Sequence, residues 1–230
     1  MEFQTYSFKV PKLAQFGNIE YDDAFKKFSE AMAQNDQTHV DAKKQLMLNQ
    51  CCEQPINGLL SLKFDSDFES GNLDLAANTF RDRNDEYDLI MRLDSNSRIH
   101  QQWFYFSVDT ANRGDYKSQK VRFNLLNFTK PYSLYQQGMM PLVWSEKLYE
   151  SQGIGWHRGG SDIQYYRGRL KRVNYRNPCS QLSFEYQFAY TGDKVYFAYG
   201  LPYTFSMLNS FIQHVQEVQH QNEELSTIFK

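Results

Sequence analysis

The chain has 230 residues, of which 41% are hydrophobic and 16% are aromatic, and its formal net charge at pH 7 is −2. This aromatic content excludes disorder throughout the chain, because disordered segments are poor in aromatic residues. No apolar run approaches the roughly 18 residues of a membrane-spanning helix, so we expect no membrane partner. Met1–Thr5 contain neither a basic nor an apolar segment, so we expect no secretory signal. The three cysteines, with Cys51 next to Cys52, predict a reducing compartment with buried or idle thiols.

The N-terminal part, residues 1–58, is polar and has helical spacing. Phe25, Phe28 and Met32 recur at the spacing of one helix face, and a second candidate helix begins near Thr38. Neither candidate has an apolar face broad enough for a helix that is stable alone. We therefore predict a helical or irregular extension that docks on the rest of the chain.

The middle part, residues 59–203, consists of short runs rich in Tyr, Phe, Val and Ile, separated by turn residues. In one of these runs Phe104, Phe106 and Val108 would share one strand face, while the residues between them point the other way. Seven or more short strands with no helix of any length between them predict an antiparallel β-sandwich or barrel, of which we favour the sandwich. The expected strands are 59–64, 87–93, 103–108, 121–128, 163–166, 182–190 and 195–199.

The last part, residues 204–230, returns to helical spacing. Its apolar residues form one stripe, and Gln, Asn and Glu fill most of the remaining positions. Soluble proteins rarely leave such a contiguous apolar patch exposed, so we expect this amphipathic helix to be buried against a partner. The candidate partner-binding face is Phe205, Leu208, Phe211, Ile212 and Val215, and the stripe continues with Val218 and Leu225.

Several motifs follow one another in the middle part. The first is FDSDFESGNL at 64–73, and later ones are HQQWFYF at 100–106, VRFNL at 121–125, GMMPL at 138–142, DIQYY at 162–166 and PYTFS at 202–206. In this order, over roughly residues 60–212, they resemble the N-terminal domain of cytosolic carboxypeptidases. The residues before about 58 lie outside the resemblance.

The resemblance implies a β-sandwich that precedes, and packs on, a zinc carboxypeptidase domain. Enzymes of that family remove glutamates from protein tails, notably those of tubulin, in the cytosol and in cilia. Their zinc site lies beyond the PYTFS-like segment, in a His-Pro-Gly-Glu motif followed by a later His, whereas this sequence ends at Lys230. We therefore expect the catalytic domain to be absent from this chain. Accordingly, we expect no catalytic residue and no metal ligand here, and zinc only in the absent domain.

One group of residues mimics a zinc site. His214, Glu217 and His220 are three residues apart, so on a helix they are neighbours. Three such ligands with an open fourth position would form a catalytic zinc arrangement. The pattern favours a solvated helix face instead, because Glu217 and His220 point away from the apolar stripe and nothing would orient the ligands.

Two further groups have alternative interpretations. Cys179 and the nearest histidine in sequence, His157, could form a nucleophile pair, although only their residue types support this. Asp65, Asp67 and Glu69 alternate with other residues, so in a strand their carboxylates would share a face that could bind a cation or arginines. The alternative is the solvated face of an edge strand. Their place in the family signature suggests a role in the fold, such as accepting hydrogen bonds from turn amides.

Basic residues are concentrated in one segment, residues 158–176, which contains a single acid, Asp162. Such an electropositive patch suits an acidic partner, either a glutamate-rich protein tail or nucleic acid, and the resemblance favours the protein. The alternative is an exposed connection whose charge is balanced by the acidic stretch at 65–94. The candidate binding residues are Arg158, Arg167, Arg169, Lys171, Arg172 and Arg176.

The sequence leaves two functions open. The first is a non-catalytic structural or interaction module in the cytoplasm, bound to tubulin, microtubules or a larger ciliary assembly such as the axoneme. The second is the N-terminal part of an active zinc carboxypeptidase that removes glutamate from tubulin or other protein tails.

Overall fold

The structure is a computed structural model that describes residues 62–78, 86–94, 100–110, 120–171 and 178–221. The two helices expected in the N-terminal part, together with Cys51 and Cys52, lie outside the described residues.

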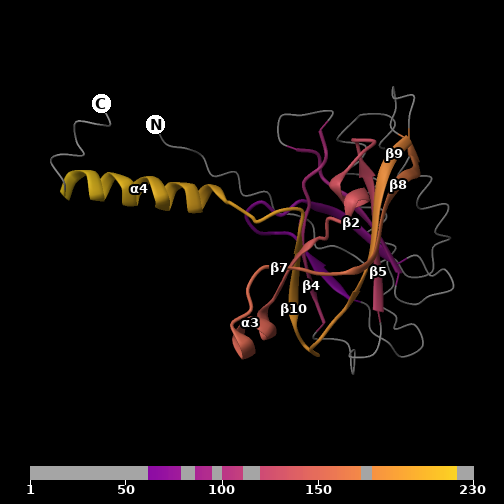
Figure 1. Ribbon diagram of the computed structural model, residues 1–230, viewed down its shortest axis with the longest axis horizontal. Helices are drawn as coiled ribbons and strands as arrows, with labels where there is room; N and C mark the ends of the chain where they lie inside the picture. The colour runs from indigo at the N-terminus through magenta and orange to yellow at the C-terminus, as the bar shows by residue number, and fades with distance from the viewer. Residues whose placement is uncertain (1–61, 79–85, 95–99, 111–119, 172–177, 222–230) are drawn as a thin grey trace.

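Two five-stranded sheets make up most of the described part (Figure 1). The first sheet has the order β1 (Lys63–Asp65), β4 (Tyr105–Asp109), β10 (Lys194–Ala198), β6 (Leu142–Ser145) and β7 (His157–Arg158). The second has the order β2 (Leu73–Asn78), β3 (Glu86–Met91), β5 (Lys120–Phe128), β9 (Pro178–Gln187) and β8 (Ser161–Lys171). The predicted β-sandwich is therefore confirmed.

One strand pair departs from the expected antiparallel arrangement. β3 and β5 run parallel, with Tyr87 opposite Phe123, whereas every other described pair is antiparallel. Parallel neighbours need a crossover connection, and here the chain crosses to β4 in the other sheet before it returns to β5.

Phenylalanine rings from both sheets fill the core. The ring centroid of Phe123 on β5 lies 6.1 Å from that of Phe106 on β4 and 5.2 Å from that of Phe197 on β10. Phe104, Phe106 and Val108 have no exposed surface, which confirms the predicted alternation. Burying a side chain of this size stabilises the fold by about 1.5–3 kcal/mol. Packing of these rings therefore holds the two sheets together.

A short helix, α3 (Glu146–Gln152), lies where we expected only strands and turns. The Ser145 hydroxyl caps it by accepting a hydrogen bond from the Leu148 amide at 2.9 Å. The buried carboxylate of Asp193 accepts from the Ser145 hydroxyl at 2.6 Å and from the Lys147 amide at 3.1 Å. These contacts tie the helix to the strand β10 that follows Asp193. A single 3₁₀ turn, η1 (Leu134–Gln137), also lies in this region.

The C-terminal helix, α4 (Phe205–Gln221), extends away from the sandwich (Figure 1). Its first turn is held by the Thr204 hydroxyl, which accepts from the Met207 amide at 3.2 Å, and by Glu69, whose carboxylate accepts from the Ser206 amide at 2.8 Å. This confirms the predicted helix over its described length. In the described part of the chain, no helix is both long and apolar enough to cross a membrane.

Candidate functional site

The acidic signature after β1 forms a turn and not a strand face, so the expectation that three carboxylates share one face is wrong. The strand ends at Asp65, and the Asp65 carboxylate accepts a hydrogen bond from the Asp67 amide at 2.9 Å. Ser66 is buried, and its hydroxyl donates to the Leu73 carbonyl at 2.9 Å. The carboxylates of Asp65 and Glu69 instead accept amide hydrogen bonds, the role in the fold suggested by the family signature.

The turn depends on a close backbone approach at Gly71. A Cβ atom at this position would lie 2.4 Å from the Ser66 carbonyl oxygen, which is closer than real Cβ contacts. Ser70, just before it, has a positive φ of 67°, a conformation that side-chain-bearing residues rarely adopt. The turn thereby presents the Ser70 carbonyl to Trp103, whose indole Nε1 donates to it at 2.9 Å.

Asn72 joins this turn to the start of β4. Its side-chain amide donates to the Trp103 carbonyl at 2.9 Å, and its side-chain oxygen accepts from the Tyr105 amide at 2.9 Å. Arg92 completes the framework, because its guanidinium donates to the Gly71 carbonyl at 2.9 Å and its amide to the Asn72 carbonyl at 2.7 Å. Hydrogen bonds from Asn72 and Arg92 therefore hold this turn against the start of β4.

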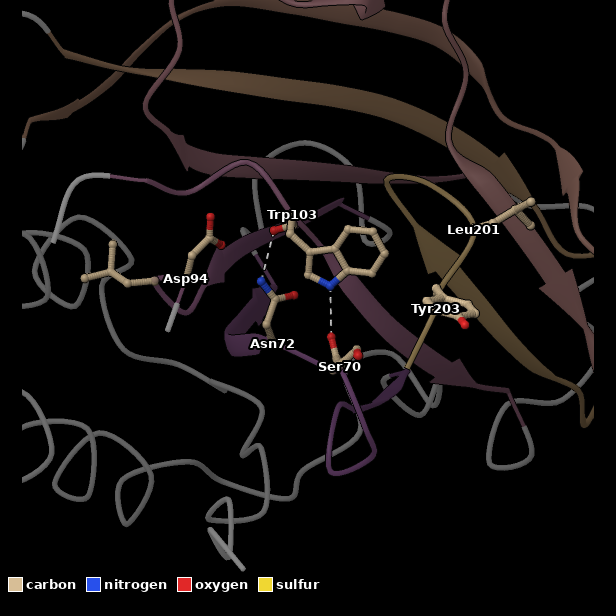
Figure 2. A pocket seen from close by; sticks show the side chains of 8 residues that line it. Ser70, Asn72, Asp94, Trp103, Leu201 and Tyr203 are labelled. Atoms are coloured by element: carbon tan, nitrogen blue, oxygen red, sulfur yellow. Dashed lines mark hydrogen bonds between the residues drawn. The ribbon is translucent and has the colours of Figure 1, made fainter. Parts of the chain in front are cut away.

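A pocket of about 490 Å³ opens beside this framework (Figure 2). Figure 2 shows the Trp103 indole in the middle, with Asp94 on one side and Tyr203 on the other. The wall at the α4 end is formed by Leu201 and Tyr203, which are 67% and 60% exposed. The lining residues are Ser70, Gly71, Asn72, Leu93, Asp94, Trp103, Leu201 and Tyr203.

Two carboxylates near this pocket differ in their surroundings. Desolvation raises the pKa of Asp94, and the charge of His100 opposes that shift. Glu69 is exposed, and the hydrogen bond from the Ser206 backbone amide lowers its pKa. Glu69 thus interacts with the N-terminal end of α4, where the helix dipole favours negative charge.

The apolar face of α4 is exposed. Phe205 is 70% exposed, Phe211 58%, Ile212 42% and Leu208 38%, and Val215 is half-buried. We call these five residues the α4 face. Leu201 and Tyr203 lead directly into it, so the pocket and the α4 face lie along one stretch of chain.

The predicted basic patch is only partly described. Arg158 is exposed on β7, where its guanidinium donates to the Met140 carbonyl at 2.5 Å, and Arg167 is exposed on β8. β8 begins at Ser161, three residues after Arg158 in the chain. Because strands rise about 3.3 Å per residue, Arg167 lies roughly 20 Å along β8 from that end. The side chains of Arg169 and Lys171, and the whole of Arg172 and Arg176, lie outside the description. Their role in binding stays a prediction.

The residues that mimic a zinc site lie on α4. His214 and Glu217 are exposed, and the side chain of His220 is not described. Within the described ranges, no three His, Cys, Asp or Glu residues lie together as a metal site would require. The location of zinc therefore stays a prediction.

The structure gives no support to a cysteine–histidine pair. Cys179 is buried on β9, whereas His157 lies on β7 in the other sheet, with its Nδ1 atom 2.9 Å from the Gly155 carbonyl oxygen.

The sequence of the sandwich matches a known family. Residues 64–199 match the sequence model of the cytosolic carboxypeptidase N-terminal domain. The chain belongs to the cytosolic carboxypeptidase family. It is 37% identical over 155 residues to Cytosolic carboxypeptidase 3 of Mus musculus, covering 67% of this chain and 14% of that protein. It is 36% identical over 170 residues to Cytosolic carboxypeptidase 2 of Homo sapiens, covering 73% of this chain and 18% of that protein.

The chain thus spans less than a fifth of the length of these two relatives. Among solved structures, a putative carboxypeptidase from Burkholderia mallei aligns with a TM-score of 0.43 and 19% identity, over 68% of this chain and 33% of that one.

Within this cytosolic carboxypeptidase N-terminal domain, three of the six signature motifs meet at the pocket. The first motif forms the turn that contains Ser70 and Gly71, the second supplies Trp103, and the last supplies Tyr203. The sequence analysis identified these motifs but did not predict the pocket. It also did not predict that Asn72 and Asp94 line it. The glycine in the first motif was the available signal, because an isolated glycine beside a strand often marks close backbone approach.

Proposed function

We propose that this chain acts as a non-catalytic interaction module of the cytosolic carboxypeptidase type, and that α4 joins it to a carboxypeptidase domain. The exposure of the α4 face carries this proposal. Each large apolar side chain is worth about 1.5–3 kcal/mol when buried, so covering Phe205, Leu208, Phe211 and Ile212 would release several kcal/mol. The relatives support this choice of partner, because the matched region is a small part of each of those longer proteins.

In this proposal, zinc and peptide-bond cleavage belong to the carboxypeptidase domain, and the module acts in the cytoplasm, at microtubules or in cilia. The module holds and orients its partner through α4, whose start is anchored to the sandwich by the Glu69–Ser206 hydrogen bond of 2.8 Å.

A second candidate is that this chain is the N-terminal part of an active zinc carboxypeptidase that removes glutamate from tubulin or other protein tails. The 14% and 18% coverage of the two relatives favours this alternative. It makes the same use of α4 but predicts that both domains belong to one polypeptide.

The experiment measures binding between this chain and the part of human Cytosolic carboxypeptidase 2 that follows its matching region. We expect binding by the unmodified chain and at least tenfold weaker binding by Phe211→Asp. The control, Gln213→Asp, introduces the same charge at an exposed polar position of the helix and should bind normally. Equal binding by all three chains, or none by any, would contradict the docking role.

The non-catalytic role is tested separately, with the chain alone. Release of glutamate from a polyglutamate peptide and bound zinc after dialysis are both expected to be absent. One zinc per chain, lost in His214→Ala, would show that the exposed histidine is a ligand after all.

A further inference from the structure

The pocket beside Trp103 contains a half-buried carboxylate, that of Asp94. None of the ion pairs between described residues involves it, although the charge of His100 favours its ionised form. The nearby Arg92 guanidinium instead donates to the Gly71 carbonyl at 2.9 Å. Partial removal of this carboxylate from water without an ion pair among the described residues is unfavourable, so a ligand that supplies a cation would relieve this cost.

The Trp103 indole lies between this carboxylate and Tyr203 (Figure 2). The Trp103 indole is fixed by its 2.9 Å hydrogen bond to the Ser70 carbonyl, so its orientation needs no further ordering when a ligand binds. Tyr203 is 60% exposed on the other side of the indole (Figure 2). The faces of Trp and Tyr rings attract cations, and Trp does so most strongly.

We propose that this pocket binds an arginine side chain from a peptide segment of a partner protein. The planar guanidinium can stack on the Trp103 ring while its N–H groups donate to both oxygens of Asp94. The methylene groups of the arginine can lie along the apolar lining of the pocket, as long basic side chains do on apolar surfaces. The pocket, at about 490 Å³, lies in the size range of sites that enclose small ligands.

Other side chains suit the pocket less well. A carboxylate would be repelled by Asp94, and a purely apolar side chain would bury Asp94 without pairing it. A lysine ammonium would pair with Asp94 but lacks the planar group that stacks on an indole. This binding site goes beyond the proposed function, because it requires neither a covered α4 face nor a carboxypeptidase domain.

The test uses the indole N–H signals of the full chain in ¹⁵N NMR spectra. The chain has three tryptophans, Trp103, Trp144 and Trp156, and Trp103→Phe identifies the relevant signal. The probe is N-acetyl-arginine amide, and its neutral analogue N-acetyl-citrulline amide is the matched ligand. We expect the arginine probe to shift the Trp103 signal saturably and to leave the other two nearly unchanged, with the citrulline probe at least threefold weaker.

The variant Asp94→Asn should weaken binding of the arginine probe at least threefold, whereas Asp67→Asn, an exposed change on the neighbouring turn, should not. Equal binding of both probes, an unchanged affinity in Asp94→Asn, or equal shifts of all three indoles would overturn the proposal. Phe211→Asp should not alter probe binding, so failure of this inference and failure of the α4 docking role can be told apart.

Discussion

A buried carboxyl group on β3 is an electrostatic weak point of the sandwich. Asp88 is 8% exposed, and its carboxylate accepts a hydrogen bond from the Asn124 side-chain amide at 2.8 Å. The same amide nitrogen also donates to Glu86 at 2.7 Å, and the Ser183 hydroxyl donates to the Asn124 oxygen at 2.7 Å. Desolvation raises the pKa of Asp88 from 3.8 to about 6, and the hydrogen bond from Asn124 only partly opposes that shift.

This shift predicts how stability depends on pH. Between its unfolded pKa of 3.8 and its folded pKa of about 6, Asp88 holds its proton only in the folded state. The free energy of unfolding should therefore fall as pH rises through this window, and the full penalty is present above it. Asp88→Asn keeps an acceptor for Asn124 and removes the charge, so we expect it to stabilise the chain by about 1–3 kcal/mol at pH 7.5.

Urea unfolding at pH 4.5, 6 and 7.5 measures this effect. The exposed change Asp67→Asn is the control and should leave the slope with pH as it is in the unmodified chain. If Asp88→Asn has the same stability and pH slope as the unmodified chain, Asp88 is not the source of the dependence.

At the scale of elements, the sequence predicted those strands whose own residues alternate between a buried face and a more polar face. The alternation of Phe104 and Phe106 with polar or half-buried neighbours identified β4 because one strand face is fully buried. It did not reveal β2, whose sequence LDLAAN has no aromatic or β-branched residue and which is held by pairing with β3. Nor did it reveal α3, because the carboxylate that secures its start belongs to Asp193, 48 residues after Ser145.

The pocket was hidden for a similar reason. Its lining comes from four separate segments, around Ser70, Asp94, Trp103 and Tyr203, and no spacing within one segment indicates that they meet. By contrast, α4 was predictable because its apolar residues recur at helical spacing within one segment.

The exposed α4 face leads to a prediction about the isolated chain. Without a partner, we expect purified chains to self-associate through this face, because an apolar patch of this kind is rarely left in contact with water. Phe211→Asp should shift the population towards monomer in sedimentation velocity, whereas Gln213→Asp should not. A chain that is monomeric at high concentration, with or without the change at Phe211, would contradict this prediction.

At the scale of the whole molecule, charge is unevenly distributed along the chain. Residues 65–94 are acidic, and residues 158–176 contain six basic residues with the single acid Asp162. Of the basic residues, Arg158 on β7 and Arg167 on β8 are exposed in the described structure, and these two strands belong to different sheets. An acidic partner would have to be long enough to reach both positions, as a glutamate-rich protein tail is, so we predict binding to the acidic tails of microtubules.

Exposed ion pairs contribute only about 0.2–1 kcal/mol each, so binding should require several arginines acting together. It should also weaken with salt, because the screening length falls from about 10 Å at 0.1 M to about 3 Å at 1 M. We therefore expect the chain to co-sediment with intact microtubules at low salt, and much less at high salt or after removal of the acidic tails.

Changing Arg167, Arg169 and Arg172 together to Glu should reduce co-sedimentation at least tenfold, because repulsion replaces each attraction. Arg158→Glu alone should have a smaller effect, since a single exposed pair contributes little. The matched control changes Lys63, Lys120 and Lys130 to Glu, which alters the net charge equally at exposed positions outside the segment. If the two triple variants bind equally well, the attraction depends on net charge alone. If binding is also unaffected by salt and by removal of the tails, residues 158–176 are an ordinary solvated part of the surface.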